Sequence, residues 1–228
     1  MVATNKQLGL GLYTPTEAAL YARLAPATMT RWLHGGNGSE QVLRSQLSVG
    51  DERIITFLDF VQALAVHDIR NQKKISLQKI REAIRLAEDK YHIEYPLARR
   101  HTTYLLGDDI YIQPEGCKDL VQVTGRQKHQ MTMKKVVEIY LVDLTFGEDG
   151  LAVAYDAFKW HGIPIRMNPK HRFGEPMVTT CGYTAQSLWE AAKTEGSIEA
   201  AAEAYGVEPA DVEAAFRYYD FLQGKTTA

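Results

Sequence analysis

Three side chains on one short predicted helix, Thr28, Thr30 and Arg31, have the chemistry needed to read base pairs. Arginine donates two parallel hydrogen bonds to guanine, and threonine contacts a thymine methyl group or a phosphate. The sequence over 26–33 predicts a helix that turns these three side chains outward, and His34 stands at its end. We therefore expect this helix to enter a groove of DNA.

Two arginines outside this helix complete the expected DNA contacts. Arg23 precedes the helix and Arg44 follows it, and both would neutralise backbone phosphates. The amino end of the helix, at Pro26, would hold a further phosphate. The alternative interpretation is that the same helices serve only packing or partner binding.

The residues before Pro26 predict a first helix. Thr14 suits the N-cap, Pro15 the first helical position, and Glu17 completes a capping box. Gly35 ends the second helix, because glycine adopts positive φ without a Cβ clash. Two short helices joined by a tight turn are typical of a helix-turn-helix. Met29, Trp32 and Leu33 of the second helix should pack inward.

The rest of the chain predicts a mainly α fold with small β elements, an α+β class. Periodicity and turn residues predict these elements: wing strands over 41–44 and 46–49, helices over 54–69 and 76–87, a hairpin of 102–106 with 110–113, a strand over 152–157, a structured loop over 168–176, and helices over 185–193, 197–205 and 209–222. Residues 128–144 fit a helix or a strand, and we favour a helix that ends by Gly147. Its apolar part, 133–144, is the candidate interface of a dimer.

Charge is distributed unevenly along the 228 residues, although the net charge is only −2. Residues 14–100 hold 13 Lys and Arg against 10 Asp and Glu, a net of +3. Residues 186–223 hold 2 against 8, a net of −6. A basic first segment and an acidic last segment are consistent with two functions in one chain, or with two ordinary solvated surfaces. No apolar run reaches the roughly 20 residues of a membrane span, and no signal peptide is evident, so a cytoplasmic protein is expected.

The acidic tail would repel nucleic acid but suit a basic protein surface. Glu199 and Glu203 would steer such a partner. Phe216, Tyr219 and Phe221 would supply the large anchors that interfaces use, although these rings could equally be core. The outward face of the tail is predicted to carry Glu195, Glu199, Glu203, Glu208, Asp211 and Glu213.

The sequence holds no recognisable catalytic or metal motif. None of the seven histidines belongs to a metal-binding pattern, and no phosphate-binding loop or nucleophile elbow occurs. Cys117 lies beside Lys118, but no histidine is placed to activate its thiol. We expect no enzyme activity, no cofactor and no metal ion.

Several stretches together resemble known families. The front resembles the helix-turn-helix and following segment of MerR-like regulators, over 13–19, 28–33, 56–61 and 75–81. The back resembles the family known as domain of unknown function 433, through Asn168-Pro169-Lys170, Phe173-Gly174-Glu175-Pro176 and Tyr205-Gly206-Val207.

Chains with both parts look like antitoxins whose partner is a PIN-like ribonuclease toxin. The resemblance implies a winged helix-turn-helix DNA-binding domain over 1–100, a mixed segment over 101–162 and a helical toxin-binding domain over 163–228. It also implies binding to operator DNA as a homodimer or hetero-oligomer. Two alternatives stay open: a MerR-like regulator that senses a small molecule, and an adaptor that does not bind DNA.

Overall fold

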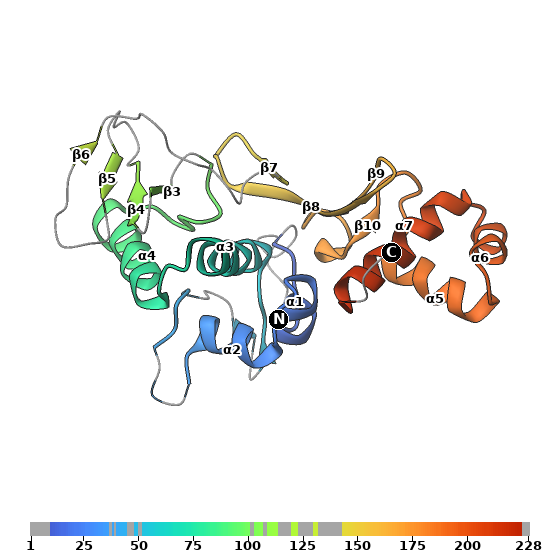
Figure 1. The fold of residues 1–228 in the computed structure, drawn as a ribbon, viewed down its shortest axis with the longest axis horizontal. Coiled ribbons are helices and arrows are strands. Elements are labelled where there is room, and N and C mark those ends of the chain that lie inside the picture. Colours follow the sequence, from blue (N-terminus) through green and yellow to red (C-terminus); the bar gives the residue numbers. More distant parts are fainter. Residues whose placement is uncertain are drawn as a thin grey trace. The chain divides into compact units, whose positions relative to one another are not determined.

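The computed structural model of the chain describes residues 10–36, 38, 40–44, 48–49, 52–100, 103–106, 109–113, 120–122, 130–131 and 143–224 (Figure 1). The chain divides into two compact units. The front unit comprises residues 13–153, and the back unit comprises residues 154–228 with 1–12. The division into three functional segments at 100 and 162 stays a prediction.

Four helices build the front unit: α1 (Pro15–Tyr21), α2 (Pro26–His34), α3 (Phe57–Lys73) and α4 (Leu77–Tyr91). The predicted capping box of α1 is present, with Thr14 and Glu17 bonded in both directions. A second capping box, Thr56 with Asp59, begins α3 and is fully buried. Tyr13 packs on Tyr21 and Phe60, so the start of the unit is anchored to the α3 core.

The strands of the front unit are short and antiparallel. They are β1 (Ser48–Val49) with β2 (Glu52–Arg53), and the sheet β3 (Thr103–Leu106), β4 (Asp109–Ile112), β5 (Leu120–Gln122) and β6 (Gln130–Met131). The predicted hairpin at 102–113 is confirmed as β3 and β4. The predicted wing is only partly correct: 41–44 is not a strand, whereas the second predicted strand, 46–49, contains β1, whose partner is β2.

The predicted helix over 128–147 is wrong at both described ends. Residues 130–131 form β6, and β7 (Leu144–Phe146) is a strand as well. Residues 132–142, which include nearly all of the candidate dimer interface, lie outside the described residues. The expected strand after the turn at 148–150 is confirmed as β8 (Ala152–Trp160).

The back unit combines a sheet with three helices. Strand β9 (Ile163–Met167) pairs antiparallel with β8 and with β10 (Met177–Val178). The predicted loop over 168–176 lies between β9 and β10, and strand β9 before it was not predicted. The three predicted helices are confirmed as α5 (Ala185–Glu195), α6 (Ile198–Tyr205) and α7 (Pro209–Leu222), which pack against one another (Figure 1).

Buried aromatic rings form the core of the back unit. Tyr218 is fully buried and contacts Phe158 of β8. Tyr219 is 6% exposed and stacks on Trp189 of α5, with centroids 4.5 Å apart and an interplanar angle of 13°. Tyr219 is thus a core ring, which corrects its assignment as a partner-binding anchor. Phe221 is half-buried against Phe158.

Asp211 also departs from its expected place. The sequence put this carboxylate on the outward acidic face of the tail, but it is 5% exposed. Its Oδ1 accepts a hydrogen bond from the Thr180 hydroxyl, which ties the start of α7 to the turn after β10.

The described chain is an α+β fold, as predicted. Seven α-helices alternate with small antiparallel sheets over the described ranges. Within those ranges, no helix is both long and apolar enough to cross a membrane.

Replacing Tyr219 by Ala should destabilise the back unit by about 3–5 kcal/mol, because truncating a buried ring leaves a cavity. Urea unfolding followed by circular dichroism measures the change. Phe216→Ala is the control, because Phe216 is only half-buried and its loss should cost less. Unchanged stability in Tyr219→Ala, combined with lost partner binding, would instead make Tyr219 an interface residue.

Candidate nucleic-acid interface

The α2 helix presents a polar face above a fully buried one. Its inward residues, as predicted, are Met29, Trp32 and Leu33, which are at most 3% exposed. Arg31 is exposed, while Thr28 and Thr30 are half-buried. Because the inward face fixes the rotation of the helix, Arg31 points away from the core of the front unit. The structure thus gathers the three predicted base-reading residues on one helix.

The amino end of α2 carries no side-chain cap. Ala25 occupies the N-cap position and makes no side-chain hydrogen bond, and Pro26 lies at the first turn. Helix amino ends carry partial positive charge and attract anions. Arg23 lies in the preceding turn, exposed and with a φ of 53°. His34 is half-buried at the opposite end of the helix.

The carboxyl end of α2 is tied to the segment that follows it. The amides of Val42 and Leu43 both donate to the carbonyl of Trp32, at 2.7 and 2.9 Å. Both side chains are also buried. The segment 40–44, which includes the predicted wing strand 41–44, is therefore hydrogen-bonded to the last turn of α2 and not to another strand.

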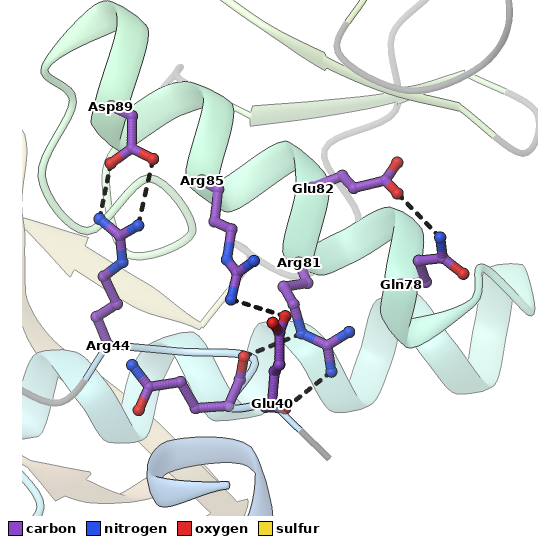
Figure 2. A network of polar contacts seen from close by, with 8 residues as sticks. Glu40, Arg44, Gln78, Arg81, Glu82, Arg85 and Asp89 are labelled. Atoms are coloured by element: carbon purple, nitrogen blue, oxygen red, sulfur yellow. Dashed lines mark hydrogen bonds and ion pairs between the residues drawn. The ribbon is translucent and has the colours of Figure 1, made fainter. Parts of the chain in front are cut away.

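Two arginines of α4 hold the same segment from the other side (Figure 2). Arg81 donates to the carbonyls of Gln41 and Glu40, at 3.0 and 2.9 Å. Arg85 pairs with the Glu40 carboxylate at 3.0 Å. Charge-assisted hydrogen bonds of this kind are stronger than neutral ones. The position of α2 thus depends on α4 through the segment 40–44.

Arg44 lies in the same network (Figure 2). Its guanidinium donates to both carboxylate oxygens of Asp89, at 2.7 and 3.2 Å, and lies 3.5 Å from Glu88. This bidentate hydrogen bond from Arg44 holds the pKa of Asp89 below its ordinary value. The arginine predicted to touch phosphate is therefore already engaged with two acids of α4, and the structure gives it a positioning role.

Glu88 is the acid of this network whose ionised form is disfavoured. Burial raises the pKa of its carboxyl above the ordinary value, and the neighbouring Asp89 and Asp59 add to the shift, while Arg44 opposes it. Burial, with the charges of Asp59, Glu94 and Glu88, also raises the pKa of Tyr95 to about 12. The helical spacing of the sequence gives no sign of the contacts that Arg81, Arg85 and Glu88 make. Their partners lie about 40 residues away, so local spacing could not reveal them.

The acidic residues predicted to meet a protein partner lie on α6. Glu199 and Glu203 are both exposed, at i and i+4 of the same helix. Phe216 and Phe221 of α7 are half-buried, so part of each ring is accessible. Their use as partner anchors stays a prediction.

The described residues gather no metal site, and the thiol of the described cysteine is not activated. Within the described residues, no three His, Cys, Asp or Glu side chains gather in a way that could hold a metal ion. Cys181 is half-buried, and burial raises the pKa of its thiol, which disfavours the reactive thiolate. Cys117 and Lys118 lie outside the described residues.

Comparison with known proteins finds similarity to a family model, to a curated protein and to a solved structure. Residues 165–219 match a family model described as "Protein of unknown function (DUF433)". A curated protein, "Putative antitoxin VapB45" of Mycobacterium tuberculosis (strain ATCC 25618 / H37Rv), is 21% identical over 226 residues, covering 87% of this chain and 89% of that protein. The X-ray crystal structure of Rv2018 from Mycobacterium tuberculosis has a TM-score of 0.55 and 18% identity, covering 92% of this chain and 99% of that one.

These matches support the resemblance to domain of unknown function 433 and the similarity to antitoxins. The DUF433 match spans β9 to α7 and contains the Asn168-Pro169 and Phe173-Gly174 motifs. The Rv2018 structure shows a shared fold. In sequence the chain is similar, along most of its length, to a protein named as an antitoxin. The MerR-like relationship and the PIN-like partner stay predictions.

Replacing Glu88 by Gln should stabilise the front unit at neutral pH. The folded protein raises the pKa of Glu88 above 4.5, so the folded state holds this proton more tightly than the unfolded chain does. That contribution is present below pH 4.5 and is lost as pH rises through the folded pKa. The variant should therefore have the higher urea midpoint at pH 7, and the gap should close below about pH 4.5.

The matched control is Glu82→Gln, on the exposed face of the same helix, which should show no such gap. A Glu88→Gln protein less stable than the wild type at pH 7 would mean that attraction to Arg44 outweighs the cost of burial.

Proposed function

We propose that this chain is the DNA-binding antitoxin of a type II toxin–antitoxin system, which neutralises a PIN-like ribonuclease toxin and represses its own operon. The observation that carries this proposal is the similarity to a protein named as an antitoxin, which extends over 87% of the chain. A match of that extent covers both units rather than one shared module. The PIN-like character of the toxin comes from the sequence resemblance described above.

The geometry of α2 supports the DNA-binding part of the proposal. Arg31 is exposed on a helix whose other face is fully buried. Contacts from the segment 40–44 and α4 hold the helix in place, so little freedom is lost when it binds. The amino end of α2 would take one phosphate, and Arg31 would take a guanine edge.

A dimer fits this function, because one short recognition helix reads only a few base pairs. Two copies on a pair of half-sites would double the contacts. We keep 133–144 as the proposed interface.

The acidic face of α6 supports the toxin-binding part. Exposed Glu199 and Glu203 give the back unit a local negative field, and surfaces that handle RNA are basic. Such a field speeds the encounter between the two proteins. Phe216 and Phe221, each partly accessible on α7, would then slow dissociation.

Arg31→Ala should weaken specific binding to the DNA upstream of the gene by about 1–3 kcal/mol, through one base position. Fluorescence anisotropy with that duplex and a scrambled duplex measures the specific part. Lys159→Ala is the control, because it removes an exposed cation of the back unit. If specificity survives in a protein lacking Thr28, Thr30 and Arg31 side chains, α2 is not the reading helix.

Charge reversal at Glu199 and Glu203 should slow association with the purified product of the neighbouring gene several-fold at low salt, and should flatten the salt dependence of the rate. Biolayer interferometry on the full chain separates association from dissociation. The matched control reverses the charges of Asp143 and Glu148, which are exposed in the front unit. Equal slowing in both double variants would show that net charge matters and the α6 face does not.

A further inference from the structure

The segment between β9 and β10 is a rigidly built loop. In this 168–174 loop, the Asn168 side chain accepts from the amide of Lys170 at 2.9 Å, and the Asn168 carbonyl accepts from His171. The amide of Gly174 donates to His171, and the carbonyl of Phe173 accepts from Leu12 at 3.0 Å. Internal hydrogen bonds of this density hold one conformation.

Two consecutive residues of the loop have unusual backbone angles. Arg172 has a φ of 45° and Phe173 a φ of 54°. Residues with a Cβ avoid this left-handed region, and each such residue costs of order 1–3 kcal/mol. Observed strain of this kind is often retained where it presents a side chain for use.

The side chain so presented is an exposed aromatic ring. Phe173 is 57% exposed, against 38% for Leu20 and Tyr183, the other exposed large apolar residues described. Across the described residues, no ring contact to Phe173 is found. A rigid loop that holds a phenylalanine in water offers a flat apolar surface to a ligand.

Two cationic residues and a histidine between them precede this ring. Lys170, His171 and Arg172 are all exposed. Among the described residues, none of the three has an acidic partner. Three other cations of the back unit are engaged by contrast: Arg166 with Asp156 at 2.6 Å, Arg217 with Glu213 at 3.3 Å, and Lys193 over the Trp189 ring at 4.1 Å.

We propose that the 168–174 loop binds single-stranded nucleic acid, with Phe173 stacked on a base and with Lys170 and Arg172 on neighbouring phosphates. Stacking on aromatic rings combined with cationic contacts to the backbone is the usual chemistry of such binding. A base inside a duplex has both faces covered by its neighbours, so an exposed phenylalanine ring reaches only an unstacked base. This proposal is independent of the duplex contact at α2.

The acidic helices of the same unit should limit the length of the bound strand. The exposed glutamates of α5 and α6 would repel a long strand. The loop should therefore contact only a few nucleotides and should show weak sequence preference, because every base has a π-face. An acidic protein could also bind these cations. Comparing Phe173→Leu with Phe173→Tyr distinguishes that ligand from nucleic acid, because only base stacking requires the aromatic ring.

The test measures binding of the full chain to labelled oligo(dT) and oligo(U) of about 12 nucleotides by fluorescence anisotropy, between about 50 and 200 mM salt. Phe173→Leu keeps an apolar side chain but removes the stacking face, and should lower affinity at least about fivefold. Phe173→Tyr keeps the ring and should bind within about twofold of the wild type. The double variant Lys170→Ala with Arg172→Ala should make the slope of log K against log salt less negative by about 1.4.

Two control variants keep the test specific. Lys159→Ala and Tyr183→Leu remove an exposed cation and an exposed ring of the same unit, and should leave oligonucleotide binding unchanged. Arg31→Ala should also leave it unchanged, so failure here is distinct from failure of the duplex-binding proposal. The proposal is overturned if neither oligonucleotide binds, if the loop variants bind as the wild type does, or if Phe173→Leu binds as tightly as Phe173→Tyr.

Discussion

The carbonyl of Trp32 accepts two amides, those of Val42 and Leu43, and the front unit is organised around this junction. Carbonyls in the last turn of a helix lack partners within the helix and need others. Here the partners come from the segment 40–44, which Arg81 and Arg85 in turn attach to α4. The orientation of α2 is therefore a property of three elements, and a change in any one of them would turn the exposed face of the helix.

This arrangement explains why so many arginines of a basic segment are structural. Arg81 donates to backbone carbonyls, and Arg85 and Arg44 pair with acids. Exposed ion pairs add little stability on their own. These contacts instead set the relative orientation of the segments they join, because a planar guanidinium fixes the angle between its two partners. Net charge by segment therefore overstates how much of the front unit is available to phosphate.

Local signals predicted the helices well. The Thr14-Pro15-Glu17 pattern and the apolar spacing of Met29, Trp32 and Leu33 depend only on near neighbours, and the structure confirms both. The strand at 163–167 was missed because Pro164 argues against a strand. Pro164 lies opposite Lys159 of β8 in the ladder, and its carbonyl accepts from the amide of Thr179 at 3.2 Å.

The candidate site was predictable where it depends on one helix and unpredictable where it depends on distant pairs. From the sequence alone, Asp211 is an ordinary acid in the first turn of α7. Its hydrogen bond with Thr180 forms only because the fold brings the two residues together. Arg44 reads as a phosphate contact, because Asp89 lies 45 positions further along the chain. The exposure of Phe173 likewise follows from backbone angles that the sequence does not display.

The stacked pair of Trp189 and Tyr219 gives the back unit an intrinsic optical signal. Two aromatic rings nearly parallel at 4.5 Å couple their electronic transitions, and the ammonium of Lys193 lies 4.1 Å from the centre of the indole. The pair joins α5 to α7, so its near-ultraviolet dichroism reports directly on whether these helices are packed together. Any ligand or partner that shifts one helix against the other would change this spectrum without an added label.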